Sequence, residues 1–391
     1  MNKYTYLIIG GGITADSAVQ GIRELDTTGS IGILTIETHS PYDRPPLTKA
    51  LWKGEDEKKI WRHTENYQVS IHYSVQATKI DRANRIVTDQ LGTQYSYEKL
   101  LFATGGTPRH LSGGSDEILY YRNYNDYHTL KSLAESKTNF IVIGGGFIAW
   151  EITAALALNN KKVTMLFPSA GIGANLYPAN LSQFLNSYYA EKGVTVLTHQ
   201  SVTSVTKEGD TLVVQTQKGQ KLTADVVIAG LGIEPNTSMA QEAGLTVNNG
   251  IAVDPNLRTE DESIYAAGDV ANFYSPALKR NVRFEHEDNA NATGKLAGRN
   301  MAGASETYDY LPFFYSDLFD LGYEAIGDVN SSLDIVEDWV EEFQQGVIYY
   351  LKEDLVKGVL LWNVWGQVEA ARELVVSQQK IDPITLRGKI R

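Results

Sequence analysis

The sequence predicts an α/β protein with two copies of one parallel-sheet unit, followed by a C-terminal α+β region. The first copy opens the chain, with an apolar run at residues 4–9, three consecutive glycines, a helical pattern and a second apolar run at 31–36. The second copy repeats this layout over residues 140–167. From residue 310 onward, strand-like runs, an aromatic row and one helical run follow, without any glycine turn of this kind.

Each residue type in the first glycine turn suits a bound dinucleotide. Gly10 permits the sharp turn out of the strand, and Gly12 lets the backbone approach a pyrophosphate. Ala15 stands where a third glycine is common and keeps the helix close to the strand, while the helix N-terminus offers N–H groups to phosphates. Glu37 follows the second strand, where a carboxylate accepts hydrogen bonds from ribose hydroxyls. This strand–turn–helix–strand–acid order predicts a Rossmann fold.

The second copy carries the same turn but lacks the acid. Gly144, Gly146 and Ala149 repeat the spacing, and the second strand is expected at residues 162–167. Neither an Asp, a Glu nor an Arg occurs at 168–170. The chain therefore has either two dinucleotide sites or one site and one decayed copy, and the choice between NADH and NADPH stays open.

Two loops provide candidate ligand contacts. Three prolines keep the start of the loop at residues 40–52 extended, and this loop lies beyond the carboxyl end of the second strand, where ligands bind in open α/β sheets. Its Arg44 and Lys49 are candidates to face phosphate or a flavin ring, although both are equally consistent with solvated loop charges. A second strand-to-turn exit ends in Asp269, whose carboxylate or backbone suits a ribityl chain or a phosphate, although a plain exit from the strand is equally consistent.

The patterns also predict elements outside the two glycine turns. Residues 53–67 are polar and helical in pattern, and a β-meander is expected at 70–73, 76–81, 85–88 and 94–96. An amphipathic helix is expected at 177–192. In the C-terminal region, strands are expected near 322–327, 346–351 and 356–362, and a last helix at 368–376.

Composition excludes several classes of function. The net charge of −12 argues against a nucleic-acid partner, which requires a basic face. The absence of cysteine excludes disulfides, thiol nucleophiles and iron–sulfur ligation, and fits a reducing cytoplasm. We expect no leader peptide, because the chain starts with its first strand, and no membrane span. Seven scattered histidines argue against a metal site, so His286 is interpreted as a general base or a structural histidine.

Taken together, the motifs resemble those of the FAD-dependent pyridine-nucleotide reductases. The resemblance depends on both glycine turns, on A-T-G-x-x-P at residues 103–108 and on Y-A-A-G-D at 265–269. The run P-Y-D-R-P-P-L-T-K at 41–49 resembles the corresponding run in one branch of this family, which contains ferredoxin reductases, rubredoxin reductases and apoptosis-inducing factor. The C-terminal segments that look most like apoptosis-inducing factor are 314–318, 322–332 and 346–363.

This resemblance implies a glutathione-reductase-like fold, with FAD on the first Rossmann fold and NADH or NADPH on the second. Hydride would pass from nicotinamide to flavin N5, and the flavin would do the chemistry. The implied domains are an FAD-binding domain at 1–114 and 247–309, an NAD(P)H-binding domain at 115–246, and a C-terminal domain at 310–391.

The resemblance also implies roles for individual residues. Lys49 and Glu151 would form an ion pair near N5, Phe147 would shield the flavin face, and His286 would lie beside the isoalloxazine. Tyr315 would replace an aromatic residue that contacts the flavin or the nucleotide. The implied contacts with FAD are Gly10, Gly12, Ala15, Glu37, Arg44, Lys49, Asp269, Glu285 and His286, and those with the nicotinamide nucleotide are Gly144, Gly146 and Ala149.

Two departures limit what the resemblance implies. Apoptosis-inducing factor has a glutamate where Ser169 stands, so its preference for NADH does not transfer. It also carries a mitochondrial presequence and a long insertion in its last domain, which this chain lacks, so death signalling is not implied and a cytoplasmic location is expected.

Three functions therefore remain open. The first is an NAD(P)H-oxidising flavoprotein with slow reoxidation or a redox-signalling role. The second is a reductase that passes electrons to a small carrier, a ferredoxin or a rubredoxin, although the negative charge disfavours docking of an acidic carrier. The third is a redox-gated binding protein with structural FAD. The resemblance also allows a homodimer, for which the sequence has no interface motif. Disulfide reduction is excluded, because it needs cysteines.

Overall fold

The computed structural model describes residues 1–391, and the chain divides into two compact units. Unit 1 comprises residues 1–44, 57–107 and 234–312, and unit 2 comprises 45–56, 108–233 and 313–391. The α/β class is confirmed, with parallel sheets in both units and an antiparallel C-terminal sheet in unit 2. The expected domain boundaries at 114, 246 and 309 stay predictions.

A seven-stranded sheet forms the centre of unit 1, in the order β3-β2-β1-β6-β5-β4, with β18 also paired to β6. The strands β3, β2, β1, β6 and β18 are parallel, whereas β4, β5 and β6 form an antiparallel meander. The sequence predicts that the strand at 70–73 belongs to this meander. This prediction is wrong, because the strand there, β3, pairs in parallel with β2 at the other edge of the sheet. The bounds are β1 Asn2–Ile9, β2 Ile31–Leu34, β3 Val69–His72, β4 Ala77–Asp81, β5 Ile86–Asp89, β6 Gln94–Phe102 and β18 Ile264–Ala266.

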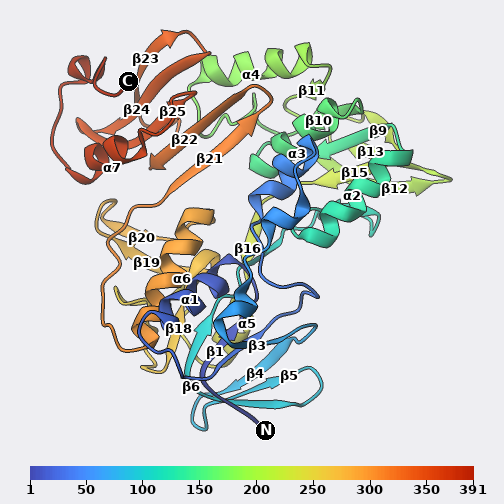
Figure 1. Ribbon diagram of the computed structural model, residues 1–391. Coiled ribbons are helices and arrows are strands. Elements are labelled where there is room, and N and C mark those ends of the chain that lie inside the picture. The colour runs from blue at the N-terminus through green and yellow to red at the C-terminus, as the bar shows by residue number, and fades with distance from the viewer. The chain divides into compact units, whose positions relative to one another are not determined.

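Two helices far apart in the sequence pack side by side in unit 1 (Figure 1): α1 at Ile13–Arg23 and α6 at Glu287–Met301. Glycines allow this close approach. A Cβ on Gly21 would lie 2.1 Å from the carbonyl oxygen of Lys295, and one on Gly298 would lie 2.1 Å from that of Ala18. The apolar residues of α1, such as Ile22, are fully buried against the sheet. The N-terminus of α1 is thereby held at the carboxyl end of β1.

Short elements complete unit 1. A helix was suggested by the polar pattern at 53–67, but residues 57–67 form two separate 3-10 turns, so this interpretation is wrong. The chain there is anchored by side chains described below rather than by helical hydrogen bonds. The bounds are η3 Glu57–Ile60, η4 Thr64–Tyr67, α5 Ser238–Glu242, β17 Ile251–Ala252, η5 Gly268–Val270, β19 Ala271–Ser275 and β20 Arg280–Val282. The strands β7 Gly106–Pro108 and β16 Ile233–Pro235 pair with each other, and each contains a boundary between the units in the sequence.

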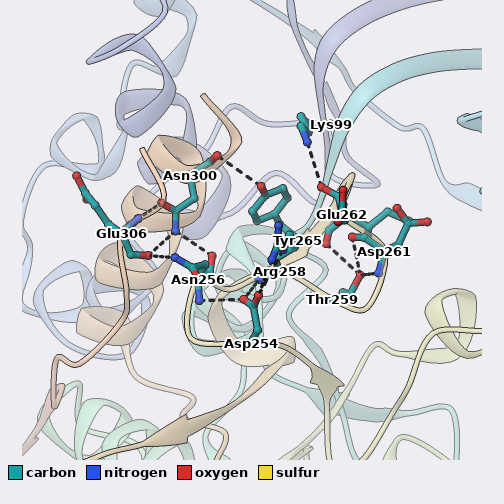
Figure 2. Close-up of polar contacts among 11 residues, drawn as sticks. Lys99, Asp254, Asn256, Arg258, Thr259, Asp261, Glu262, Tyr265, Asn300 and Glu306 are labelled. Carbon is teal, nitrogen blue, oxygen red and sulfur yellow. Dashed lines mark hydrogen bonds and ion pairs between the residues drawn. The ribbon is translucent and has the colours of Figure 1, made fainter. Parts of the chain in front are cut away.

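Figure 2 shows the polar contacts that hold the loop in front of β18. The Asn256 side chain donates to the carbonyl oxygen of Glu306 at 2.8 Å, and Asn300 donates to the carbonyl oxygen of Asn256 at 2.9 Å. Within the loop, Arg258 pairs with Asp254 at 3.2 Å. Because these bonds tie the loop to the end of α6, they also position the turn that follows β18.

Unit 2 contains a second parallel sheet, in the order β11-β10-β9-β15-β8. A capping box between Asn123 and Asp126 starts α2. The expected helix at 177–192 is confirmed, although it begins two residues later, and the strand at 162–167 is confirmed as β10. The bounds are β8 Ile118–Tyr120, α2 Tyr124–Ser136, β9 Asn139–Ile143, α3 Phe147–Leu158, β10 Lys162–Leu166, α4 Ala179–Glu191, β11 Thr195–Leu197 and β15 Val226–Ala229, and the antiparallel sheet has β12 Val202–Glu208, β13 Thr211–Thr216 and β14 Lys221–Ala224.

The C-terminal part of unit 2 is a five-stranded antiparallel sheet, in the order β21-β22-β25-β24-β23. The expected strands at 322–327, 346–351 and 356–362 and the helix at 368–376 are confirmed. The aromatic row from residue 313 is itself a strand, which the sequence interpretation missed. The bounds are β21 Phe313–Leu318, β22 Leu321–Gly327, β23 Asp334–Glu341, β24 Gln345–Lys352, β25 Leu355–Trp362, α7 Val368–Val376 and η6 Pro383–Leu386, and 3-10 turns η1 Pro45–Thr48 and η2 Ala50–Lys53 also belong to unit 2.

The helices of both units are too short or too polar to cross a bilayer, and none meets the length and hydropathy of a membrane span.

The glycine contact between α1 and α6 gives a stability prediction. We expect Gly298→Ala to destabilise unit 1 by about 1–3 kcal/mol, because the added methyl group would overlap the backbone of Ala18. The midpoint of thermal unfolding should fall by roughly 2–4 °C per kcal/mol. Lys295→Ala on the same helix is the matched control, because it removes only an exposed ion pair with Glu24. Equal shifts for the two variants would contradict the close packing.

Candidate functional site

The first glycine turn leaves an open space in front of α1. Gly10 has φ +110°, and a Cβ there would lie 2.1 Å from the carbonyl oxygen of Ala103, so only glycine fits. Around Gly12, by contrast, a Cβ would find only Arg44 within 4 Å, at 3.9 Å. No side chain caps α1, so its first N–H groups remain available to an anion. Together with buried Ala15, this turn fits the pyrophosphate of a dinucleotide.

Glu37 is held beside this turn by two donors. Its carboxylate accepts hydrogen bonds from the Tyr42 hydroxyl and from Arg44 Nη2, each at 2.7 Å. Burial by itself lowers the pKa of Arg44, but the neighbouring Tyr42, Glu37 and Asp269 outweigh it and raise that pKa. The structure therefore brings together Glu37, Arg44 and Asp269, three of the expected FAD contacts.

The turn that carries Asp269 lies against the first turn of α1. Gly268 has φ +71°, and a Cβ there would lie 2.2 Å from Thr14 Oγ1. Arg283, which the sequence interpretation did not single out, donates from Nη1 to the carbonyl oxygen of Asp269 at 3.0 Å. The same nitrogen pairs with Glu285 Oε1 at 2.8 Å, so Arg283 connects two of the expected site residues.

His286 caps the N-terminus of α6 with its backbone, directly after Glu285. Burial lowers the pKa of its imidazole to about 4, although the charge of Asp269 acts in the opposite direction. The ring stacks on Phe284 with centroids 5.4 Å apart. At neutral pH this histidine is uncharged, so it can exchange hydrogen bonds with a ligand but cannot supply a positive charge.

Arg62 is the principal residue of unit 1 that sequence reasoning missed. Its guanidinium contacts Asp16 Oδ2 at 2.7 Å on α1 and Asp43 Oδ1 at 2.5 Å on the loop that carries Arg44. It also donates to Asn291 Oδ1 on α6 at 2.8 Å. Since Asp16 is fully buried, Arg62 neutralises a buried charge and clamps the glycine-turn helix, the loop and α6 together.

In unit 2, the expected partners Lys49 and Glu151 form an ion pair of 2.7 Å. Glu151 is almost fully buried on α3, with 3% of its side chain exposed, and Lys49 has 12% exposed. Two hydroxyls complete the carboxylate: Thr48 donates to Oε2 and Ser316 donates to Oε1, each at 2.5 Å. Both oxygens of the buried carboxylate thus accept hydrogen bonds, Oε1 from Lys49 and Ser316 and Oε2 from Thr48.

Aromatic rings surround this ion pair. Lys49 Nζ lies 5.1 Å from the centroid of the Tyr315 ring, a cation–π distance. The Phe147 ring lies 4.9 Å from Trp150, whose indole N–H donates to Ser316 at 2.8 Å. Ser316 was missed, although its position directly after Tyr315 on β21 places it on the opposite, buried face of the strand.

The second glycine turn repeats the first. Gly144 has φ +134°, and a Cβ there would lie 2.2 Å from the carbonyl oxygen of Gly230. Gly146 has no atom within 4 Å of a Cβ position, and no side chain caps α3. Ala149 is buried against the strand. These features fit a second dinucleotide rather than a decayed copy.

The expected site residues therefore form two groups, one in each unit. No cluster of three or more metal-ligating side chains occurs in the chain. Unit 1 holds Gly10, Gly12, Ala15, Glu37, Arg44, Asp269, Glu285 and His286, and unit 2 holds Lys49, Gly144, Gly146, Phe147, Ala149, Glu151 and Tyr315.

Two family models and several known proteins are similar to this chain. The family model described as pyridine nucleotide-disulphide oxidoreductase matches residues 4–294, and the model for the C-terminal part of apoptosis-inducing factor matches 297–341 and 336–377. Apoptosis-inducing factor 1, mitochondrial, of Dictyostelium discoideum is 31% identical over 98% of this chain and 80% of its own length.

Two reductases are also similar. The ferredoxin–NAD(+) reductase component of the anthranilate 1,2-dioxygenase system of Burkholderia cepacia is 32% identical, over 84% of this chain and 82% of its own. Among solved structures, the covalent putidaredoxin reductase–putidaredoxin complex matches with a TM-score of 0.92 at 27% identity, over 98% of this chain and 95% of that one.

The Arg62 clamp predicts a loss of cofactor retention. Replacing Arg62 by Met leaves the buried Asp16 carboxylate unpaired and frees the loop of Arg44, so we expect FAD affinity to fall at least about tenfold. The measurement is the dissociation constant of FAD by fluorescence quenching. Arg62→Lys should recover part of the loss, and Arg85→Met, at an exposed turn, should cause none. Unchanged affinity in Arg62→Met would refute the clamp.

The low pKa of His286 predicts acid sensitivity. Between pH 6.5 and about 4 the unfolded chain binds a proton at this residue that the folded chain does not, so folding stability falls as the pH decreases through this window. We expect the drop in unfolding midpoint from pH 7 to pH 5 to be smaller in His286→Gln than in the wild type. His63→Asn, at an exposed histidine, is the control and should keep the wild-type slope.

Proposed function

Because the chain belongs to the family of pyridine nucleotide-disulphide oxidoreductases and is an FAD-dependent NAD(P)H oxidoreductase, we propose that it reoxidises slowly or signals through its redox state, as in apoptosis-inducing factor. The disulphide chemistry in the family's name does not apply, because the chain contains no cysteine. Electrons must therefore leave the protein toward another acceptor.

The roles of the site residues are part of this proposal. When bound, NAD(P)H supplies the hydride and FAD accepts it. The turn at Gly10 and Gly12 and the N–H groups of α1 would hold the FAD pyrophosphate, while Glu37 would accept hydrogen bonds from its ribose. The turn at Gly144 and Gly146 holds the nicotinamide dinucleotide in the same manner.

The observation that carries the proposal is the buried ion pair of Lys49 and Glu151. A fixed cation such as the Lys49 ammonium would stabilise negative charge on a flavin bound beside it. The Glu151 carboxylate fixes the position of the Lys49 ammonium at 2.7 Å, and the hydroxyls of Thr48 and Ser316 hold that carboxylate in place. Phe147, at the start of α3, is proposed to shield the flavin until the nicotinamide ring displaces it.

A second candidate function is supported by the comparisons. The similar structure is a reductase bound to its carrier, putidaredoxin, and one similar relative is named a ferredoxin–NAD(+) reductase component. Passage of electrons to a small carrier is therefore the alternative, although the net charge of −12 disfavours an acidic partner. A redox-gated binding protein with structural FAD is the third alternative. A homodimer and a cytoplasmic location are also proposed, the first from the family resemblance alone and the second from the sequence.

The proposed function is tested by anaerobic mixing with NADH and, separately, with NADPH, while flavin absorbance is recorded. We expect bleaching with a long-lived charge-transfer band that decays slowly after air is admitted. In the Glu151→Gln variant, the nucleotide should reduce the bound flavin at least about tenfold more slowly, because Lys49 loses its ionic partner. An exposed acid-to-amide change, Glu117→Gln, is the control.

The outcomes separate the alternatives. Rapid reoxidation only by an added ferredoxin or rubredoxin would favour the carrier reductase. A stable reduced complex with altered hydrodynamic size would favour the redox-gated binding protein. The proposed function would be excluded if the purified protein contained no flavin, or if neither NADH nor NADPH bleached the flavin.

A further inference from the structure

The two glycine turns are equivalent hydrogen bond by hydrogen bond. The N–H of Gly10 donates to the carbonyl of Leu34 at 2.8 Å, and the N–H of Gly144 donates to that of Leu166 at 3.0 Å. The residue that follows each of these strands then lies against the middle glycine of the turn: Thr35 against Gly11 in unit 1, and the Phe167 ring against Gly145 in unit 2.

The equivalence continues to Glu37, the residue proposed to accept hydrogen bonds from the ribose. The N–H of Ser74 donates to the carbonyl of Glu37 at 3.2 Å, and the N–H of His199 donates to the carbonyl of Ser169 at 3.1 Å. Both donors have left-handed backbones, with φ of 57° at Ser74 and 54° at His199. Ser169 therefore occupies in unit 2 the place of Glu37 in unit 1, and His199 occupies that of Ser74.

Unit 2 also lacks the groups that hold such an acid. Tyr42 and Arg44 fix the Glu37 carboxylate, but the residues at the same spacing after Ser169 are Ala174 and Leu176, whose side chains carry no hydrogen-bond donor. The hydroxyl of Ser169 instead donates to the carbonyl of the nearby Gly171, at 3.1 Å. The position has no carboxylate that would accept a ribose 2′-hydroxyl or repel a 2′-phosphate.

We propose that unit 2 accepts NADPH at least as well as NADH, with the 2′-phosphate beside Ser169 and His199. The inference rests on the proposed function, in which the second fold holds the nicotinamide nucleotide. The imidazole of His199 is exposed and presents an N–H donor that a phosphate oxygen accepts in either protonation state. A 2′-hydroxyl, by contrast, finds no strong acceptor here, so NADH has no compensating advantage.

The test compares two adenosine probes, 2′,5′-ADP and 5′-AMP, by calorimetry on the FAD-loaded protein. We expect 2′,5′-ADP to bind at least as tightly as 5′-AMP. Ser169→Glu should weaken the binding of 2′,5′-ADP at least about tenfold, because a carboxylate would face the phosphate dianion. The same substitution should change the affinity for 5′-AMP less than about threefold. His199→Ala should weaken only 2′,5′-ADP, about three- to tenfold.

Controls make the outcome unambiguous. Ser132→Glu adds the same charge at an exposed position on α2 and should leave the dissociation constants of both probes unchanged. Retained 5′-AMP binding shows that Ser169→Glu is folded. Tenfold tighter binding of 5′-AMP by the wild type, or equal effects of Ser169→Glu on both probes, would overturn this inference while NADH still bleaches the flavin. If neither probe binds and neither nucleotide bleaches the flavin, the proposed function and this inference are both excluded.

Discussion

The buried carboxylate of Glu151 is the constraint on which unit 2 depends. Removing a carboxylate from water costs several kcal/mol unless nearly every lone pair finds a donor. The donors are Lys49, Thr48 and Ser316, which come from the proline-rich loop and from β21, while Glu151 itself lies on α3. Three segments that are distant in the sequence must therefore assemble before this charge is satisfied, and the same assembly places Tyr315 over the ammonium of Lys49.

An analogous requirement operates in unit 1 around a different acid. Asp16 is fully buried on α1, and Arg62 neutralises its charge through an ion pair while also contacting Asp43 and Asn291. In each unit, then, the helix that starts at the glycine turn carries a buried carboxylate within its first two turns, and a cation from another segment neutralises it. A buried pair of this kind specifies one arrangement of its segments more than it adds stability, because misplacement of either partner leaves a charge without water or a counterion.

The candidate site was predictable from sequence where the chemistry is local. The turns at Gly10 and Gly144 were recognised because the glycines, the flanking strands and the helix that follows are contiguous. Lys49 and Glu151 were paired only through a family resemblance, since nothing near either residue in the sequence indicates the other. Arg62, Arg283 and Ser316 were missed because each acts through a partner far along the chain, and arginines and serines in polar loops are usually solvated.

By itself, the sequence determined the period of its elements and therefore the α/β class. Apolar runs next to glycines specify parallel strands, and α7 was located at its observed bounds because its 3.6-residue period is regular. Tertiary structure alone decided which strands pair. β3 joins β2 in parallel rather than entering the meander, and residues 57–67 form 3-10 turns held by Arg62 and Thr64 instead of a helix. The reason is physical: periodicity reports which face of a segment is apolar, whereas pairing and buried charges depend on partners that only the folded chain brings within hydrogen-bonding distance.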